Sequence, residues 1–300
     1  MRARKFWIAI VFTFLSSSPY LTHGVRATPL DVFIIQDVGG SMAAELATLK
    51  AINNLVFTEL KSLAPLPGEF QIGVGSFSDY AINPFGQLGL SDYPYRRNLD
   101  LTGDLIPFAT SIVNLTIRVG GDAPESQLTA LYQAASGAGQ VVGAIPPGQQ
   151  ASFRAGAEKV FILITDGPFH QPGDAGDIPY PGPSFQVTAA AIQAIGAKLI
   201  GIASSAAALD DLRHIVGLAG TVASVGIDCD GNGSIDIAAG QPLVCMIGET
   251  GAGLESNIFS LTSHAIAEPA QAPEPTSLVL LGLGLGLLGL RRRRIARAPS

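Results

Sequence analysis

The sequence predicts an α/β fold in which one doubly wound, mostly parallel sheet is flanked by helices. Apolar runs rich in β-branched and aromatic residues alternate with segments whose apolar residues recur at helical spacing. The strands are apolar throughout, as in parallel sheets that are covered on both faces. Two of these strands, 31–37 and 158–166, end in an aspartate. Such sheets bind ligands beyond the carboxyl ends of their strands, so the two acids mark a functional edge.

The first half of the fold begins with the strand "DVFIIQD", whose residues Val32 to Ile35 suit a buried strand. The following helix, 44–63, repeats its apolar residues at helical spacing and is ended by Pro65. Residues 70–78 predict the next strand, and helical patterns follow at 104–115 and 125–139.

The second half continues the alternation of strands and helices. The acids Asp210 and Asp211 fall in the first turn of one of its helices, where the helix dipole favours them. We expect residues 28–267 to form one domain, since no internal repeat or linker interrupts it. The remaining predicted elements are strands at 158–166, 198–204 and 221–225 and helices at 184–196, 207–220 and 254–266.

The N-terminus has the features of a secretory signal peptide. Arg2, Arg4 and Lys5 precede a ten-residue apolar stretch, 6–15, which is short for a membrane span of about 20 residues. Small residues at Val25 and Ala27 predict cleavage by signal peptidase after residue 27. We therefore expect residues 1–27 to be a leader and the protein to be exported.

The C-terminus combines a Pro-Glu-Pro triplet at 273–275, an apolar run at 278–290 and the basic cluster Arg291 to Arg294. In this order the three features resemble the PEP-CTERM sorting signal of Gram-negative bacteria. The resemblance implies a linker at 268–277, a sorting tail at 273–300, processing by exosortase and transient membrane association through the tail. It also implies delivery to the cell surface or the extracellular matrix; a simple membrane anchor is the alternative reading.

Removal of the two ends makes the chain strongly acidic. The leader and the tail hold nine of the 18 basic residues but, counting the tail from 273, only one of the 24 acidic residues, which leaves a net charge near −14. Nucleic-acid binders present basic patches, so we expect no nucleic-acid partner. An acidic exported domain is better suited to binding Ca²⁺ and other cations.

The two cysteines, Cys229 and Cys245, bracket an acidic insertion at 228–247. Both lie in the exported part of the chain, where a disulfide is the default expectation. The segment "DCDGNGSID" follows the first nine positions of an EF-hand calcium loop, although Ala239 stands at position twelve in place of the bidentate acid. A surface turn pinned by the disulfide is the alternative to a weak calcium loop. The candidate ligands in the loop are Asp228, Asp230, Asn232, Ser234 and Asp236.

The strand-to-helix turn after Asp37 favours a metal over the other chemistries of such turns. A P-loop requires a lysine after its glycines, but Met42 follows Ser41. The sequence "GGSMA" also lacks the G-x-S-x-G pattern of a nucleophile elbow. Carboxylates and a hydroxyl are ligands that Mg²⁺, Mn²⁺ and Ca²⁺ accept. We find no acid–base or nucleophile set that indicates an enzyme.

Four segments, in order, resemble von Willebrand factor A (VWA) domains, and most closely the A-like domain of integrin β subunits. "DVFIIQDVGGSM" resembles their D-x-S-x-S metal-ion-dependent adhesion site, or MIDAS. The segment 68–85 is similar to their second and third strands, 120–134 to the loop with a metal-binding Asp-x-Pro-Glu, and "KVFILITDGPFHQPGDAG" to the strand that supplies the last MIDAS aspartate. The resemblance places Asp37, Ser41, Glu125 and Asp166 at MIDAS ligand positions.

The resemblance also implies neighbouring metal sites and shows where this chain departs from the family. Asp122 and Pro124 fall at an adjacent calcium site, and Glu45 at a third site whose partner acid is replaced by Ala44. Gly39 replaces the first MIDAS serine, so we expect water to fill the place of the missing hydroxyl and the affinity to fall. Gly120 stands where the family has an asparagine ligand.

The implied function is binding. In the family the metal keeps an open coordination position that an acidic group of a macromolecular partner completes. We therefore expect an exported, surface- or matrix-associated module that binds its ligand through Mg²⁺ or Mn²⁺, with Ca²⁺ possible, in cell adhesion or a biofilm matrix. The alternatives are a metal-independent structural component of the extracellular matrix and, more distantly, a hydrolase that uses metal-bound water.

Overall fold

The computed structural model describes residues 28–87, 89, 91–174 and 179–267. The predicted leader, the linker and the sorting tail lie outside these residues. Within the described part of the chain, no helix has both the length and the apolar character that crossing a bilayer requires.

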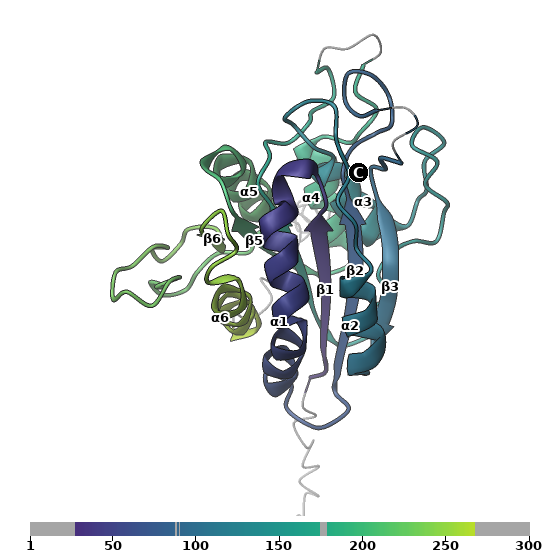
Figure 1. Cartoon of the computed structure of the whole chain (residues 1–300). Helices are drawn as coiled ribbons and strands as arrows, with labels where there is room; N and C mark the ends of the chain where they lie inside the picture. Colours follow the sequence, from purple (N-terminus) through teal and green to yellow (C-terminus); the bar gives the residue numbers. More distant parts are fainter. Residues whose placement is uncertain (1–27, 88, 90, 175–178, 268–300) are drawn as a thin grey trace, which may run out of the picture.

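A six-stranded sheet forms the centre of the fold, with strand order β3-β2-β1-β4-β5-β6 (Figure 1). All neighbours pair in parallel except β2 and β3, which are antiparallel. The predicted class, a mostly parallel α/β sheet, is therefore confirmed. The strands are β1 (Leu30–Asp37), β2 (Phe70–Phe77), β3 (Arg96–Thr102), β4 (Glu158–Thr165), β5 (Lys198–Ala203) and β6 (Val244–Met246).

Helices cover the sheet on both faces. The helices are α1 (Ala43–Ser62), α2 (Leu105–Val113), α3 (Gln127–Ser136), α4 (Phe185–Ala194), α5 (Ala206–Ala219) and α6 (Leu254–Ala267). Figure 1 shows α1, α2 and α6 in front of the sheet, with α1 in contact with the other two. On the other side α4 packs between α3 and α5. The central strand β1 is buried along its whole length, which explains its continuous apolar run.

Two expectations about strands are wrong. Residues 221–225 form no strand; Val222 makes an isolated bridge to Pro242, and the edge strand is β6 instead. The third strand also lies outside 68–85, at Arg96–Thr102. Its sequence, "RRNLDLT", is polar and only partly buried, because β3 is an antiparallel edge strand. An apolar run predicts a buried strand but misses an edge strand of this kind.

The topology determines where the site lies. Strands β1 and β4 are parallel neighbours at the centre of the sheet, with Gln36 paired to Ile164. Their carboxyl ends therefore meet at the same edge, which we call the carboxylate edge. Asp37 is the last residue of β1 and Asp166 directly follows β4.

Candidate metal centre at the carboxylate edge

Asp37 lies fully buried at the end of β1, and both of its carboxylate oxygens accept hydrogen bonds. The backbone N–H of Gly39 donates to Oδ1 at 2.7 Å, and the hydroxyl of Thr165 donates to Oδ2 at 2.6 Å. The amide of Gln127 in turn donates to the Thr165 hydroxyl at 3.0 Å. This chain of donors fixes the orientation of Asp37.

Ser41 and Asp166 form the more exposed side of the site. Ser41 belongs to a single 3₁₀ turn, Gly40–Met42, that leads from β1 into α1. Its hydroxyl donates to Asp166 Oδ1 at 3.0 Å, although the two residues are 125 positions apart. Asp166 is half-buried and Ser41 is exposed, so this side of the site faces solvent.

Glu125 reaches the same place from the loop before α3. Its backbone forms a parallel bridge to Phe169: its N–H donates to the carbonyl of Pro168 at 3.0 Å, and its carbonyl accepts from the N–H of His170 at 3.1 Å. The side chain is buried, and Oε2 has no hydrogen-bond partner. The predicted ligands Asp37, Ser41, Glu125 and Asp166 thus lie together at one edge of the sheet.

The buried carboxylates of the site have strongly shifted proton affinities. The pKa of Asp37 is raised to about 7. Burial is the largest cause, the hydrogen bonds from Thr165 and Gly39 offset part of the rise, and the charges of Asp166 and Asp79 add to it. Burial, followed by the charge of Asp37, also raises the pKa of Glu125 well above its ordinary value. A divalent cation would compensate this negative charge.

The residues present fit a divalent cation. The donors are carboxylate and hydroxyl oxygens, which Mg²⁺, Mn²⁺ and Ca²⁺ prefer. A buried carboxylate oxygen without a hydrogen-bond partner, such as Glu125 Oε2, is costly unless an ion or water compensates it. Asp37, Ser41, Glu125 and Asp166 are the residues that would hold the ion.

A second cluster next to the site contains two residues that the sequence analysis did not select, Asp79 and His170. The buried imidazole of His170 places Nε2 at 3.0 Å from Asp79 Oδ2 and at 3.2 Å from Asp122 Oδ1, and Nδ1 at 3.0 Å from Asp174 Oδ2. The first two acids and the histidine have their ligand atoms within 4.8 Å of one another. Asp79 comes two residues after the end of β2, so it is a third acid close to a strand end, and this signal could have identified it.

The second cluster stabilises a cationic imidazole. Burial alone would lower the pKa of His170, but the hydrogen bond and charge of Asp79, with contributions from Asp174 and Asp122, raise it to about 9. Burial raises the pKa of Asp79 to about 6 despite its contact with His170. A protonated His170 therefore lies against Asp122, the acid that the family resemblance assigns to the neighbouring calcium site.

The structure gives no contact that assigns the other two predicted ligands, Pro124 and Glu45, to a metal site. Pro124 is half-buried and directly precedes Glu125. Glu45 is buried in the first turn of α1, and its Oε2 has no hydrogen-bond partner. Burial, with smaller contributions from the charges of Asp166 and Glu249, raises its pKa. The role of both residues in a metal site stays a prediction.

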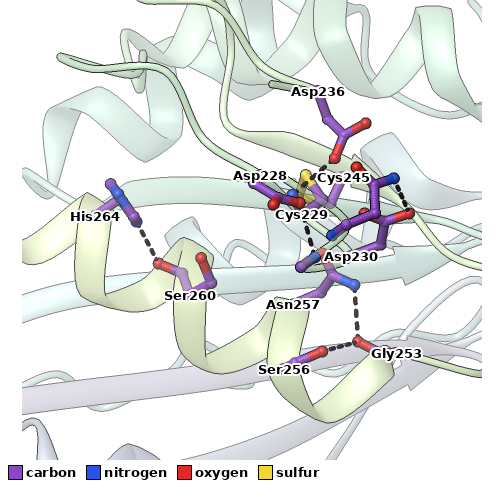
Figure 2. Close-up of a disulfide and its surroundings, with 12 residues drawn as sticks. Asp228, Cys229, Asp230, Asp236, Cys245, Gly253, Ser256, Asn257, Ser260 and His264 are labelled. Carbon is purple, nitrogen blue, oxygen red and sulfur yellow. Dashed lines mark hydrogen bonds between the residues drawn. A yellow bond between two sulfur atoms is a disulfide. The ribbon is translucent and has the colours of Figure 1, made fainter. Parts of the chain in front are cut away.

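The acidic insertion follows α5; its loop projects away from the sheet, and its last residues form the edge strand β6 (Figure 1). The predicted disulfide between Cys229 and Cys245 is confirmed, and it ties the loop to β6 (Figure 2). Asp228, Asp230 and Asp236 each offer an oxygen within 4.8 Å of the others. Backbone N–H groups of Gly231 and Gly233 donate to Asp228 at 2.7 Å. These contacts occur in an ordinary Asx-type turn too, so the calcium loop stays a prediction.

The remaining two candidate ligands of the loop contact their neighbours. The side-chain amide of Asn232 donates to Asp230 Oδ2 at 2.8 Å, and its Oδ1 accepts from the backbone N–H of Ser234 at 2.8 Å.

The family profile described as "Integrin beta chain VWA domain" matches residues 25–178, and the PEP-CTERM protein-sorting motif matches residues 271–294. Integrin beta-PS of Drosophila melanogaster is 24% identical over 157 residues, which cover 49% of this chain and 17% of the relative. Integrin beta-6 of Ovis aries is 28% identical over 122 residues, which cover 36% of this chain and 15% of the relative. The chain therefore spans about a sixth of the length of these curated relatives.

Among solved structures, proximal thread matrix protein 1 from the mussel byssus has the same fold. It superposes with a TM-score of 0.51 at 15% identity and covers 79% of this chain and 49% of its own. The sorting motif indicates export from a Gram-negative bacterium. With the profile matching half of its length over the segment that carries Asp37, Ser41, Glu125 and Asp166, the chain belongs to the integrin beta chain VWA domain family.

Proposed function

We propose that residues 28–267 form an adhesion module that binds a macromolecular ligand through a divalent cation at the carboxylate edge. The observation that carries the proposal is the arrangement of Asp37, Glu125 and Asp166. These three acids come from separate parts of the chain and lie together, with the Ser41 hydroxyl on Asp166 at 3.0 Å. A folded protein rarely buries carboxylates side by side without a compensating cation.

The cation would be Mg²⁺ or Mn²⁺, with Ca²⁺ as a weaker candidate. Asp37 and Glu125 would hold it from the buried side, and Ser41 and Asp166 from the side that faces solvent. An ion bound there supplies a positive charge that an acidic group of the partner can contact. Asp37 is oriented by Thr165 and Gly39, and burial keeps competing water away from its carboxylate.

Export supports an adhesive role over an intracellular one. The sorting motif at 271–294 supports processing by exosortase and display at the cell surface or in the matrix. We propose that signal peptidase removes residues 1–27 and that the tail holds the protein at the inner membrane only until it is processed. In this proposal the protein binds its partner without turning over a substrate.

The experiment is adhesion of beads coated with the purified protein to native surface material, with Mg²⁺ and Ca²⁺ or with EDTA. We expect capture with metal and its loss with chelator and in Asp37→Ala. Asp104→Ala is the matched control, because Asp104 is an exposed carboxylate before α2 whose side chain makes no capping hydrogen bond. Capture that is indifferent to both EDTA and Asp37→Ala would contradict the proposal and favour a metal-independent structural component of the matrix.

A further inference from the structure

Gly39 is a glycine for reasons of space. Its backbone angles, φ −55° and ψ 161°, are open to any residue, so no left-handed conformation requires glycine here. A Cβ atom at this position, however, would lie 2.5 Å from Glu125 Oε1 and 3.1 Å from Asp37 Oδ1. Carbon and oxygen do not approach to 2.5 Å without a bond, so any side chain at 39 must displace the carboxylate of Glu125.

Gly120 lies on another side of the same carboxylate oxygen. A Cβ on Gly120 would lie 3.3 Å from Glu125 Oε1, and its φ of +70° independently favours glycine. These two glycines stand at the positions where the family resemblance expects a serine and an asparagine ligand. Both missing side chains would therefore border one oxygen atom, Glu125 Oε1.

The main chain of Glu125 is fixed behind the carboxylate by its backbone hydrogen bonds to Pro168 and His170. Gly167 also leaves room for the side chain, since a Cβ on Gly167 would lie 3.3 Å from Glu125 Cγ. The side chain is buried, yet Oε2 has no hydrogen-bond partner. No hydrogen bond therefore accounts for that oxygen, which remains available to a ligand.

We propose that Gly39 and Gly120 determine the composition of the metal site by admitting the Glu125 carboxylate beside Asp37, so that one carboxylate occupies the space of two absent side chains. This inference rests on the proposed function, because it concerns the same cation. It replaces the expectation that water fills the place of a missing hydroxyl. Its consequence is that restoring the family's serine at position 39 damages the site.

The test is a mutant cycle between positions 39 and 125, read out as the Asp37-dependent binding of Mn²⁺ by calorimetry. In the otherwise unchanged chain, Gly39→Ser weakens Mn²⁺ binding at least about tenfold. In the Glu125→Ala background the same substitution tightens binding, because the hydroxyl then enters free space. Gly40→Ala is the matched control: a Cβ there meets only ordinary contacts with the carbonyls of Val119 and Arg118, at 3.4 and 3.5 Å, and leaves affinity unchanged.

The outcomes separate this inference from the proposed function. Tighter or unchanged Mn²⁺ binding by Gly39→Ser in the unchanged chain overturns the inference and leaves the metal site standing. A chain whose Mn²⁺ binding is the same with and without Asp37→Ala overturns the proposed function itself. Circular dichroism and the metal-free melting temperature of each variant show whether it folds. If Gly39→Ser does not fold, Gly39→Ala in both backgrounds gives the same cycle. The expected result is then weaker Mn²⁺ binding in the unchanged chain and no weakening in the Glu125→Ala background.

Discussion

The hydroxyl of Thr165, the last residue of β4, donates a hydrogen bond of 2.6 Å to Asp37 Oδ2 at the end of the neighbouring strand β1. Because Gln127 donates to the same hydroxyl, the hydroxyl proton of Thr165 is directed at Asp37. The contact therefore orients the buried carboxylate and lowers its pKa against the larger effect of burial. It joins the two central strands at the point where the site begins.

Removal of the Thr165 hydroxyl should weaken metal binding without unfolding the protein. Thr165→Val keeps the shape of the side chain but leaves Asp37 Oδ2 without its donor. We expect Mg²⁺ or Mn²⁺ affinity to fall by about 10- to 100-fold, the usual effect of losing an outer contact to a ligand. Thr165→Ser, which keeps the hydroxyl, should stay near the parent affinity in calorimetry. Equal affinities for the valine and serine variants would show that the Thr165 hydroxyl does not contribute to metal binding.

The metal-free protein should lose stability as the pH rises. The pKa of Asp37 is raised from 3.8 to about 7, so its stabilising contribution is complete below 3.8 and is lost as the pH rises through 7. The pKa of His170 is raised from 6.5 to about 9, so its contribution to stability is complete below pH 6.5 and is lost as the pH rises through 9. Urea unfolding in EDTA should show that the free energy of unfolding falls as the pH rises through this range. In Asp37→Asn the fall that belongs to Asp37, below about pH 7, should be smaller.

Metal should change that pH profile. The ion requires a deprotonated Asp37, so Mg²⁺ affinity should fall as the pH drops below about 7, and binding should release protons. Stability in Mg²⁺ minus stability in EDTA should therefore grow with rising pH. A difference that is constant between pH 5 and pH 8 would mean that Asp37 does not bind the ion.

His170 should be a structural cation of the second cluster. Its ring stacks on Tyr180, with ring centroids 4.3 Å apart, and packs edge-on against Phe85, so His170→Phe keeps an aromatic ring there but leaves Asp79 buried without its partner. We expect a loss of about 3 to 5 kcal/mol in the free energy of unfolding at pH 7. The double variant with Asp79→Asn should recover part of it in urea unfolding. Additive losses in the double variant would show that the two residues do not interact.

The acidic insertion should bind one calcium ion weakly if the loop is a calcium site. Asp230→Ala removes a carboxylate that accepts hydrogen bonds only from Asn232. Asp228 accepts from the backbone N–H of Gly231 and so holds the turn, which makes it less suitable for a test. Calorimetry should show one calcium ion fewer in Asp230→Ala, with a dissociation constant in the parent of about 10⁻⁴ to 10⁻³ M. Asp104→Ala should keep the parent stoichiometry. Unchanged stoichiometry in Asp230→Ala would identify the insertion as a surface turn.

The sequence predicts the buried centre of the fold well because burial leaves a pattern. Strands β1 and β4 are enclosed on both faces, so each has an uninterrupted apolar run, 32–35 in β1 and 160–164 in β4, shortly before the acid at its end. At the edges this signal fails. Strand β3 is polar and partly exposed, and β6 has three residues. The β-branched residues at 221–225 have strand propensity, but they pair only through the isolated bridge from Val222 to Pro242.

The site could be predicted only as far as the family motifs reach. The motifs identify Asp37, Ser41, Glu125 and Asp166, which the fold does bring together. They do not identify Asp79 or His170, because the contact between an acid just after β2 and a histidine in the loop after β4 depends on how that loop folds back. The relation of Gly39 to Glu125 is likewise a matter of space, and a glycine in a sequence does not show which side chain occupies the room it leaves.

The central claim is that one divalent cation is held by side chains from distant parts of the chain. The most direct measurement is the melting temperature of the purified protein with millimolar Mg²⁺ or Mn²⁺ and with EDTA, beside the Asp37→Ala/Asp166→Ala variant. A ligand that binds only the folded state raises the melting temperature, so the parent should gain stability with metal. The variant should show no gain; a shift equal to that of the parent would contradict the account.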